Sequence, residues 1–136
     1  GSKVSGSVTS DSGSPVESNV TLTSTTDSSK TFTVPTTDGA YEITVPNDTY
    51  KFVVTKKAHL SYTKNELAVS ENVVKDVELK GGDVTLDDTI NIRDITALIA
   101  VYNTDDATAD VNGSGTVDIR DLTVLLGNYG KTAIAE

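Results

Sequence analysis

Apolar and polar residues alternate at every second position through much of residues 3–79. An alternation of period two places successive side chains on opposite faces of a strand, so it predicts strands that bury one face. The clearest examples are residues 20–23, 30–34, 40–45 and 50–54. Shorter apolar segments add three candidates, at residues 4–8, 60–63 and 73–79. The pattern therefore predicts about seven short strands in a small antiparallel β-sandwich.

Beyond Gly81-Gly82 the period changes from two to that of a helix. Residues 92–102 and 119–129 align with each other and carry apolar residues at i, i+3 and i+7, which predicts two amphipathic helices. We expect these positions to be buried between the helices: Ile95, Leu98 and Tyr102 in the first, Leu122, Leu125 and Tyr129 in the second.

Two modules follow from this change of pattern, at residues 3–80 and 81–136. Two glycines are too few for a flexible linker, so we expect the modules to pack against each other as one rigid body. The fold class is mixed: an antiparallel β-sandwich followed by a small helical module.

A twelve-residue segment rich in side-chain oxygen precedes each predicted helix, at residues 83–94 and 110–121. Positions 1, 3, 5, 9 and 12 offer side chains, position 7 a backbone carbonyl, and position 8 is apolar, which is the spacing that wraps a calcium ion. The expected ligands are Asp83, Thr85, Asp87, Thr89, Asn91 and Asp94 in the first loop, and Asp110, Asn112, Ser114, Thr116, Asp118 and Asp121 in the second. Oxygen ligands without sulfur or imidazole favour Ca²⁺ over Zn²⁺, so we expect two calcium ions.

The first loop departs from the second at two backbone positions. Position 6 needs a left-handed conformation, which Gly115 supplies freely and Asp88 adopts at some cost. With Leu86 at position 4 as well, we expect the first loop to be the weaker or more strained site. A solvated turn rich in Asp and Asn is the alternative for one loop alone, but two loops in the same register argue against it.

Composition excludes several other functions. The 136 residues carry 20 acidic and 11 basic side chains, and a net charge of −9 argues against nucleic-acid or anionic-membrane partners. The absence of cysteine excludes a disulfide framework and a thiol nucleophile, and His59 cannot form a histidine metal site alone. We expect His59 at the surface or on an edge strand. Neither a membrane span nor a signal peptide is visible, so the chain is either cytosolic or part of a longer secreted protein.

Two other uses of the acidic residues fit the sequence less well. Asp87 and Asp94 could act as a glycosidase pair, but such carboxylates flank an open sugar cleft, whereas these are expected to converge on a cation. A calcium buffer or sensor has helices on both sides of each loop and a methionine-rich groove, and this chain contains no methionine. We therefore predict no catalytic residue, no enzyme activity and no small-molecule substrate.

Parts of the first module resemble a known family: the segments 4–8, 37–43 and 49–52 are similar to the carboxypeptidase-regulatory or prealbumin-like sandwich repeats of bacterial surface proteins. The resemblance implies an immunoglobulin-like or prealbumin-like fold and a structural role. A carbohydrate- or surface-binding sandwich beside an EF-hand-like calcium module is the alternative function. Five tyrosines and no tryptophan, scattered along the chain, do not favour a sugar-binding face.

The second module also resembles a family. Residues 77–82 read as strand and turn and residues 103–109 are short and polar, so neither loop has an entering helix. Two loop-and-exiting-helix repeats, each half an EF-hand, resemble the dockerin module of bacterial cellulosomes over residues 82–131. A sandwich fused directly to it resembles the X-module and dockerin pair of scaffoldins. This implies a secreted, cell-surface-associated adaptor in cellulose degradation, monomeric when free, that binds a type II cohesin on an anchoring scaffoldin.

The outer face of the two helices is too apolar for a surface that meets only water. The candidate partner-binding residues are Ile92, Arg93, Thr96, Ile99, Ala100, Ile119, Arg120, Thr123, Val124 and Leu126. The alternative is that Ile99 and Leu126 merely widen the buried stripe. Because the two repeats match at Ile92-Arg93 and Ile119-Arg120 but diverge further along, two binding orientations are conceivable and we expect one to dominate.

Overall fold

The computed structural model describes residues 1–12 and 17–136. Residues 11–15 contain Ser, Gly and Pro, which favour a turn, but residues 13–16 lie outside the described residues. The strands of the first module are β1 (Ser2–Ser10), β2 (Asn19–Ser24), β3 (Thr31–Pro35), β4 (Ala40–Val45), β5 (Asp48–Thr55), β6 (Tyr62–Val69), β7 (Val73–Val74) and β8 (Val77–Leu79). They are followed by helices α1 (Ile92–Ala100) and α2 (Ile119–Gly127) and a last short strand, β9 (Ile134–Ala135).

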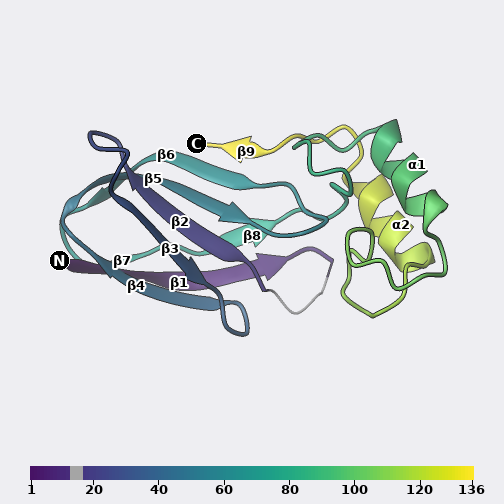
Figure 1. Ribbon diagram of the computed structural model, residues 1–136, viewed down its shortest axis with the longest axis horizontal. Coiled ribbons are helices and arrows are strands. Elements are labelled where there is room, and N and C mark those ends of the chain that lie inside the picture. Colours follow the sequence, from purple (N-terminus) through teal and green to yellow (C-terminus); the bar gives the residue numbers. More distant parts are fainter. Residues whose placement is uncertain (13–16) are drawn as a thin grey trace.

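The strands form two sheets, and the helices lie beyond one end of them, opposite the N-terminus (Figure 1). One sheet has the order β4-β1-β7, with β8 also paired to β1, and the other has the order β3-β2-β5-β6-β9. The predicted fold class, a β-sandwich followed by a two-helix module, is confirmed. Three pairings are parallel, β1 with β7, β1 with β8 and β6 with β9, which the expected antiparallel pattern did not include.

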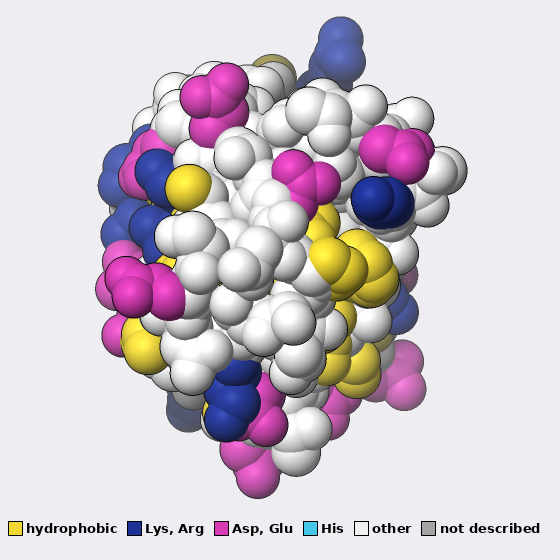
Figure 2. Space-filling view, turned by 90° about the vertical axis from the view of Figure 1, so that its left-hand side faces the viewer, with side chains coloured by type: hydrophobic (Ala, Val, Ile, Leu, Met, Phe, Trp, Pro, Cys, Tyr) yellow, Lys and Arg dark blue, Asp and Glu magenta, His cyan; other side chains and the backbone are white. Residues whose placement is uncertain are grey.

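The sandwich core is aliphatic with a few rings. Phe52 packs against Tyr41 and Tyr62 with ring centroids 6.0 and 6.2 Å apart, and the surrounding side chains are mainly valine and leucine. Serine and threonine fill many of the outward positions of β1, β2 and β3. The end of the sandwich remote from the helices is covered largely by uncharged polar groups and backbone (Figure 2). The expected strand at residues 60–63 is displaced: β6 begins at Tyr62, and Leu60 belongs to a different core.

That second core lies between the helices and takes two side chains from the sandwich. Ala58 and Leu60, on the connection between β5 and β6, are buried with Leu98 and Leu125 of the helices. Its other buried members are Val84, Ile90, Ala109, Val111 and Val117. In return, Ile134 of β9 packs against the sandwich core. Each module therefore contributes apolar side chains to the core of the other. The two modules pack directly against each other, as expected from the short linker.

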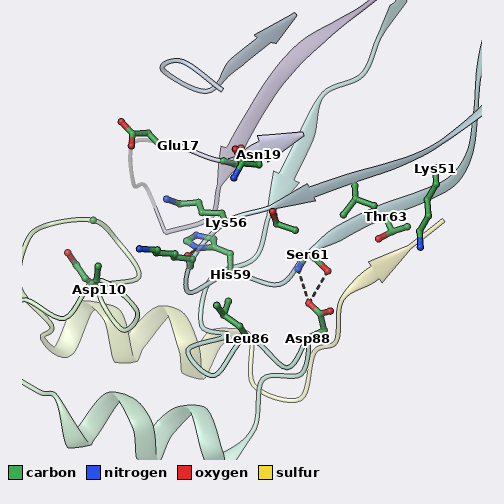
Figure 3. A pocket seen from close by; sticks show the side chains of 16 residues that line it. Glu17, Asn19, Lys51, Lys56, His59, Ser61, Thr63, Leu86, Asp88 and Asp110 are labelled. Atoms are coloured by element: carbon green, nitrogen blue, oxygen red, sulfur yellow. Dashed lines mark hydrogen bonds between the residues drawn. The ribbon is translucent and has the colours of Figure 1, made fainter. Parts of the chain in front are cut away.

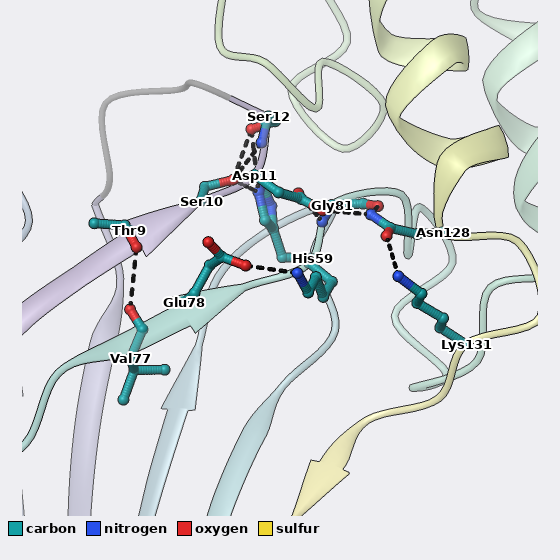
Figure 4. Close-up of polar contacts among 11 residues, drawn as sticks. Thr9, Ser10, Asp11, Ser12, His59, Val77, Glu78, Gly81, Asn128 and Lys131 are labelled. Carbon is teal, nitrogen blue, oxygen red and sulfur yellow. Dashed lines mark hydrogen bonds and ion pairs between the residues drawn. The ribbon is translucent and has the colours of Figure 1, made fainter.

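A polar network closes the junction (Figure 4). The carboxylate of Asp11 accepts hydrogen bonds from the Gly81 backbone N–H at 2.8 Å and from the Asn128 side-chain amide at 2.7 Å. The same amide donates to the Gly81 carbonyl at 2.9 Å, and Lys131 donates to the Asn128 side-chain oxygen at 3.1 Å. Asn128, the residue that caps the C-terminus of α2, is thus hydrogen-bonded to both the sandwich and the linker.

The two glycines of the linker are required by close approach rather than by flexibility. A Cβ on Gly81 would lie 2.5 Å from a methyl carbon of Val111. A Cβ on Gly82 would lie 2.8 Å from the Leu125 backbone, and Gly82 has φ +123°, a conformation that side-chain-bearing residues rarely adopt. The linker is therefore held between the two modules.

His59 does not lie at the surface, as the sequence suggested, but is buried beside this junction. One ring nitrogen lies 2.6 Å from the Ser10 hydroxyl and the other 2.7 Å from the Lys57 carbonyl. Burial lowers the pKa of His59, since the charged imidazolium is poorly solvated there. The expectation failed because the segment after β5 turns into the helical core instead of continuing as an exposed strand.

We expect Asn128→Ala to destabilise the calcium-loaded protein by about 1–3 kcal/mol, because the Asp11 carboxylate and the Gly81 carbonyl lose a donor at a buried junction. Urea unfolding monitored by circular dichroism measures the change. Asn65→Ala, at an exposed position on β6, is the matched control and should change stability by less than about 0.5 kcal/mol. Equal effects of the two substitutions would contradict the role given to Asn128.

Candidate functional site

Residues 83–94 and 110–121 adopt the same loop twice, as their backbone hydrogen bonds show. In the first loop the Asp83 carboxylate accepts from the N–H groups of Asp87 and Asp88, at 3.3 and 2.9 Å. In the second loop the Asp110 carboxylate accepts from the equivalent Ser114 and Gly115, at 3.1 and 2.8 Å. Position 1 therefore holds positions 5 and 6 in both loops, which curls the chain around one point.

The acidic residue at position 12 closes each loop and begins each helix. The Asp94 carboxylate accepts from Thr85 N–H and from Asn91 N–H, at 3.0 and 2.8 Å, and Asp121 accepts from Asn112 and Asp118 in the same way, at 2.9 Å each. Asn91 and Asp118, at position 9, are the N-caps of α1 and α2, and each pair forms a capping box. The candidate ligands thus also cap the helices, so loop and helix form together.

Three carboxylates converge in the first loop. Asp83, Asp87 and Asp94 each have an oxygen within 4.8 Å of the others, and Asp83 and Asp94 are fully buried. Oxygens that bind one Ca²⁺ at 2.3–2.6 Å lie at such separations, so the set fits a hard cation. The Thr85 hydroxyl donates a hydrogen bond to the Asp94 carboxylate at 2.9 Å, and the Thr89 N–H donates one to the Asp87 carboxylate at 3.2 Å.

In the second loop, position 5 is Ser114, which donates to the Thr116 carbonyl at 3.1 Å. The carboxylates of the second loop are Asp110 and Asp121, which surround its centre, and Asp118, which caps α2. Asn112 accepts from Ser114 N–H at 3.2 Å, which places the amide inside the loop. The two loops share their geometry, and the first has one more acid at the centre.

Positions 4 and 6 are left-handed in both loops. Gly113 and Gly115 have φ +68° and +93° in the second loop, where glycine meets no steric penalty. Leu86 and Asp88 have φ +57° and +63° in the first, where each non-glycine residue costs of order 1–3 kcal/mol. The left-handed conformation that the sequence required of Asp88 is present, and so is the backbone strain expected of the first loop.

Burial raises the pKa of Asp83 to about 6, and the neighbouring Asp94 and Asp87 carboxylates add to the effect, whereas hydrogen bonds from Asp88 and Asp87 N–H oppose it. A buried carboxylate surrounded by others is poorly stabilised when ionised. A bound cation would supply the missing positive charge.

The outer face of the helices carries exposed apolar side chains. Ile92, Ile99, Ile119 and Leu126 are between 53% and 61% exposed, so Ile99 and Leu126 do not merely widen the core. Arg93, Arg120, Thr96, Thr123 and Ala100 are also exposed on the same helices. Val124 differs: it is half-buried in the helical core, next to Gly81.

Tyr102 and Tyr129 are 39% and 50% exposed, so the prediction that they are buried is wrong. The helices end at Ala100 and Gly127, and both tyrosines lie in the following turns, where the helical spacing no longer applies. Leu98 and Leu125 are fully buried as predicted, and Ile95 and Leu122 are partly buried.

Two families match the chain. Residues 3–80 match the carboxypeptidase regulatory-like domain and residues 81–128 match the dockerin type I domain. The chain belongs to the carboxypeptidase regulatory-like family in its first module and carries a dockerin domain in its second. No curated protein gives a significant match.

Two solved structures resemble the whole chain, each with a TM-score of 0.77 and 98% of both chains covered. They are a C-terminal and an N-terminal interface mutant of a type II cohesin–X–dockerin complex from Acetivibrio cellulolyticus, 24% and 22% identical to this chain. At these identities the likeness shows the fold, which is the predicted sandwich-and-dockerin pair. Among the described residues of this chain, no helix is long and apolar enough to cross a membrane.

Sequence reasoning missed the sandwich residues that support the dockerin loops. Ser61 donates to the Asp88 carboxylate from both its N–H and its hydroxyl, and Leu60 fills the helical core. The apolar and polar pattern of residues 60–63 fitted an ordinary strand, so it held no signal for these contacts. The one available hint was that Leu86 and Asp88 stand where the second loop has glycine, so that their left-handed backbone needs contacts from outside the loop.

We expect calcium-free stability to depend on the ionisation of Asp83. The pKa of Asp83 is raised to about 6 in the folded state. The stability that its protonated carboxyl contributes is therefore fully present below the unfolded pKa near 3.8 and is lost as the pH rises through 6. In EDTA, the melting temperature of the native chain should fall relative to that of Asp83→Asn between pH 4 and 7. In calcium the sign reverses, because binding requires the ionised carboxylate. Parallel profiles for the two proteins in EDTA would refute this.

Proposed function

We propose that this chain is a non-catalytic adaptor that binds a cohesin domain through the outer face of α1 and α2. The observation that carries the proposal is the apolar face formed by Ile92, Ile99, Ile119 and Leu126 on a domain of the dockerin family. An exposed apolar patch rimmed by polar groups is characteristic of a protein-binding surface. We assign Arg93, Thr96, Arg120 and Thr123 to the polar rim and Ala100 to the apolar patch, which the half-buried Val124 supports from below.

Two calcium ions belong to this proposal, one in each loop. The ligands are those expected from the spacing, with Asp83, Asp87 and Asp94 as the acidic centre of the first loop and Asp110, Asp118 and Asp121 as the acids of the second. The carboxylate cluster of the first loop, the hydrogen bonding that both loops share and the raised pKa of Asp83 support it. Because the same residues cap the helices, binding the ions and presenting the partner face are coupled.

The partner class proposed is a type II cohesin. The likeness to chains from type II cohesin–X–dockerin complexes supports this, whereas the matched family is named for type I dockerins, so the two classes need a direct comparison. We also propose residues 3–80 and 81–136 as the two modules, and an extracellular, cell-surface-associated cellulosome as the setting. The sandwich then acts as a brace for the dockerin.

Calcium removal should destabilise the dockerin part, so that it unfolds at a lower temperature. Binding to the folded state alone stabilises by about 4 kcal/mol when free calcium exceeds Kd a thousandfold. Differential scanning calorimetry with and without EDTA measures this. Asp110→Ala should lower the melting temperature in calcium more than Thr85→Ala, since it removes a carboxylate rather than a hydroxyl. Identical traces with and without chelator would exclude the calcium role.

Isothermal titration against type I and type II cohesins tests the partner. We expect Ile99→Asp and Leu126→Asp each to weaken type II binding at least tenfold, because each places a charge in a desolvated apolar contact. Thr33→Asp, exposed on β3, is the control and should leave affinity within twofold. If only the double variant loses binding, the dockerin uses two orientations; if both single variants bind normally while folded, the helix face is not the binding surface.

A further inference from the structure

Among residues 1–12 and 17–136, position 6 of the first loop contacts the sandwich, whereas position 6 of the second loop is open. The Asp88 carboxylate accepts hydrogen bonds from the Ser61 N–H at 3.3 Å and from the Ser61 hydroxyl at 2.9 Å (Figure 3). The Asp88 carbonyl accepts from the Ala133 N–H at 2.9 Å. At Gly115 a Cβ would meet nothing within 4 Å. The duplicated loops therefore differ in what surrounds them at the same position.

The backbone of Asp88 in turn holds a buried candidate ligand. Its N–H donates to an Asp83 carboxylate oxygen at 2.9 Å, and it does so with φ +63°. Glycine reaches this conformation without strain, whereas aspartate prefers the right-handed region. Relaxation of Asp88 would turn its N–H away from Asp83, so the contacts to Ser61 and Ala133 preserve the arrangement around the carboxylates.

The segment that follows α2 runs from this loop to the sandwich. Ile90, at position 8, exchanges backbone hydrogen bonds with Gly130 and Lys131, at 2.8 and 2.9 Å. Strand β9 then pairs with β6, and the Ile134 N–H donates to the Ser61 carbonyl at 3.2 Å. Ser61 is thus bonded to Asp88 by its N–H and hydroxyl and to β9 by its carbonyl.

A cavity of about 850 Å³ lies at the same junction, lined by both loops and by the β5 and β6 side of the sandwich (Figure 3). Leu86, the other left-handed non-glycine residue of the first loop, lines it together with Asp88. Both departures of the first loop from glycine therefore line this cavity between the loops and the sandwich.

We propose that Asp88 is a positioning residue for the first calcium site, held in its left-handed conformation by Ser61 and by the docking of β9 on β6. The first loop is then linked to the sandwich by hydrogen bonds at position 6, and no such bond reaches Gly115 of the second loop from the sandwich residues that the structure describes. Because linkage is reciprocal, calcium in the first loop strengthens the docking of β9 by the same factor as docked β9 strengthens calcium binding. This inference rests on the calcium binding proposed above, but not on the cohesin partner.

Ser61→Ala in the full chain tests the link, with Thr63→Ala, two residues further along β6, as the matched control. Backbone amide NMR during a calcium titration reads the loops separately, through Asp88 and Thr89 for the first and Gly115 and Thr116 for the second. Loss of one hydrogen bond to a charged group predicts at least fivefold weaker calcium binding in the first loop. The second loop, and both loops in Thr63→Ala, should stay within twofold.

Asp88→Gly distinguishes positioning from general stability. Glycine removes both the strain and the bonds to Ser61, so adding Ser61→Ala to this variant should change calcium affinity of the first loop by less than twofold. An undiminished effect of Ser61→Ala in the Asp88→Gly background would overturn the positioning role.

Hydrogen exchange of the Glu136 amide, which donates to the Thr63 carbonyl at 2.8 Å, tests the reverse direction. Calcium should slow this exchange at least fivefold in the native chain and in Asp110→Asn, but not in Asp83→Asn. Equal changes in both loops on Ser61→Ala, or calcium-independent exchange at Glu136, would overturn the link while leaving the proposed function intact. Absence of calcium binding in the native chain would overturn both.

Discussion

The helical module depends on gathering carboxylates that repel one another. Asp83, Asp94 and Asp121 are fully buried, and each is surrounded by backbone N–H donors from its own loop. Those donors give the loop its shape but do not neutralise the charge, as the raised pKa of Asp83 shows. A divalent cation satisfies the same oxygens and removes the repulsion. Because Asp94 and Asp121 also complete the capping boxes of α1 and α2, the helices and the exposed apolar face they carry depend on the same interaction.

A short helical segment can bury only a small apolar core, and the sandwich enlarges it. Leu60 and Ala58 extend the core between the helices, and Ile134, near the C-terminus of the helical module, packs against the sandwich core. The Asp11 and Asn128 hydrogen bonds close the polar edge of the same junction. Small domains gain stability steeply with added buried surface, so this exchange matters more to the dockerin than to the sandwich. The sandwich is accordingly part of the structural support of the loops.

Features set by local spacing were predictable from the sequence. The period-two strands, the two loops, the left-handed position 6 and the buried Leu98 and Leu125 depend on residues near one another in the chain. What failed depends on contacts between the modules or on where a helix stops. His59 is buried because its segment enters the helical core, and Tyr102 is exposed because α1 ends before it. Strand β9 has only two residues, too few to show a period, and its partner is more than seventy positions away.

Two of the positions at which the repeats differ form hydrogen bonds to the sandwich. Asn128 takes the place that Val101 has in the first repeat and bonds to Asp11, while Asp88 takes the place of Gly115 and bonds to Ser61. On the outer face, by contrast, Ile92 matches Ile119 and both are similarly exposed. The outer helix face thus keeps its internal symmetry at this position, but the whole chain does not, because a half-turn of the dockerin carries the sandwich packed against it to the other side. A partner that touches only the helices would meet two nearly equivalent surfaces. A partner large enough to reach the sandwich would distinguish them, so the sandwich can select the orientation without altering a single contact on the helix face.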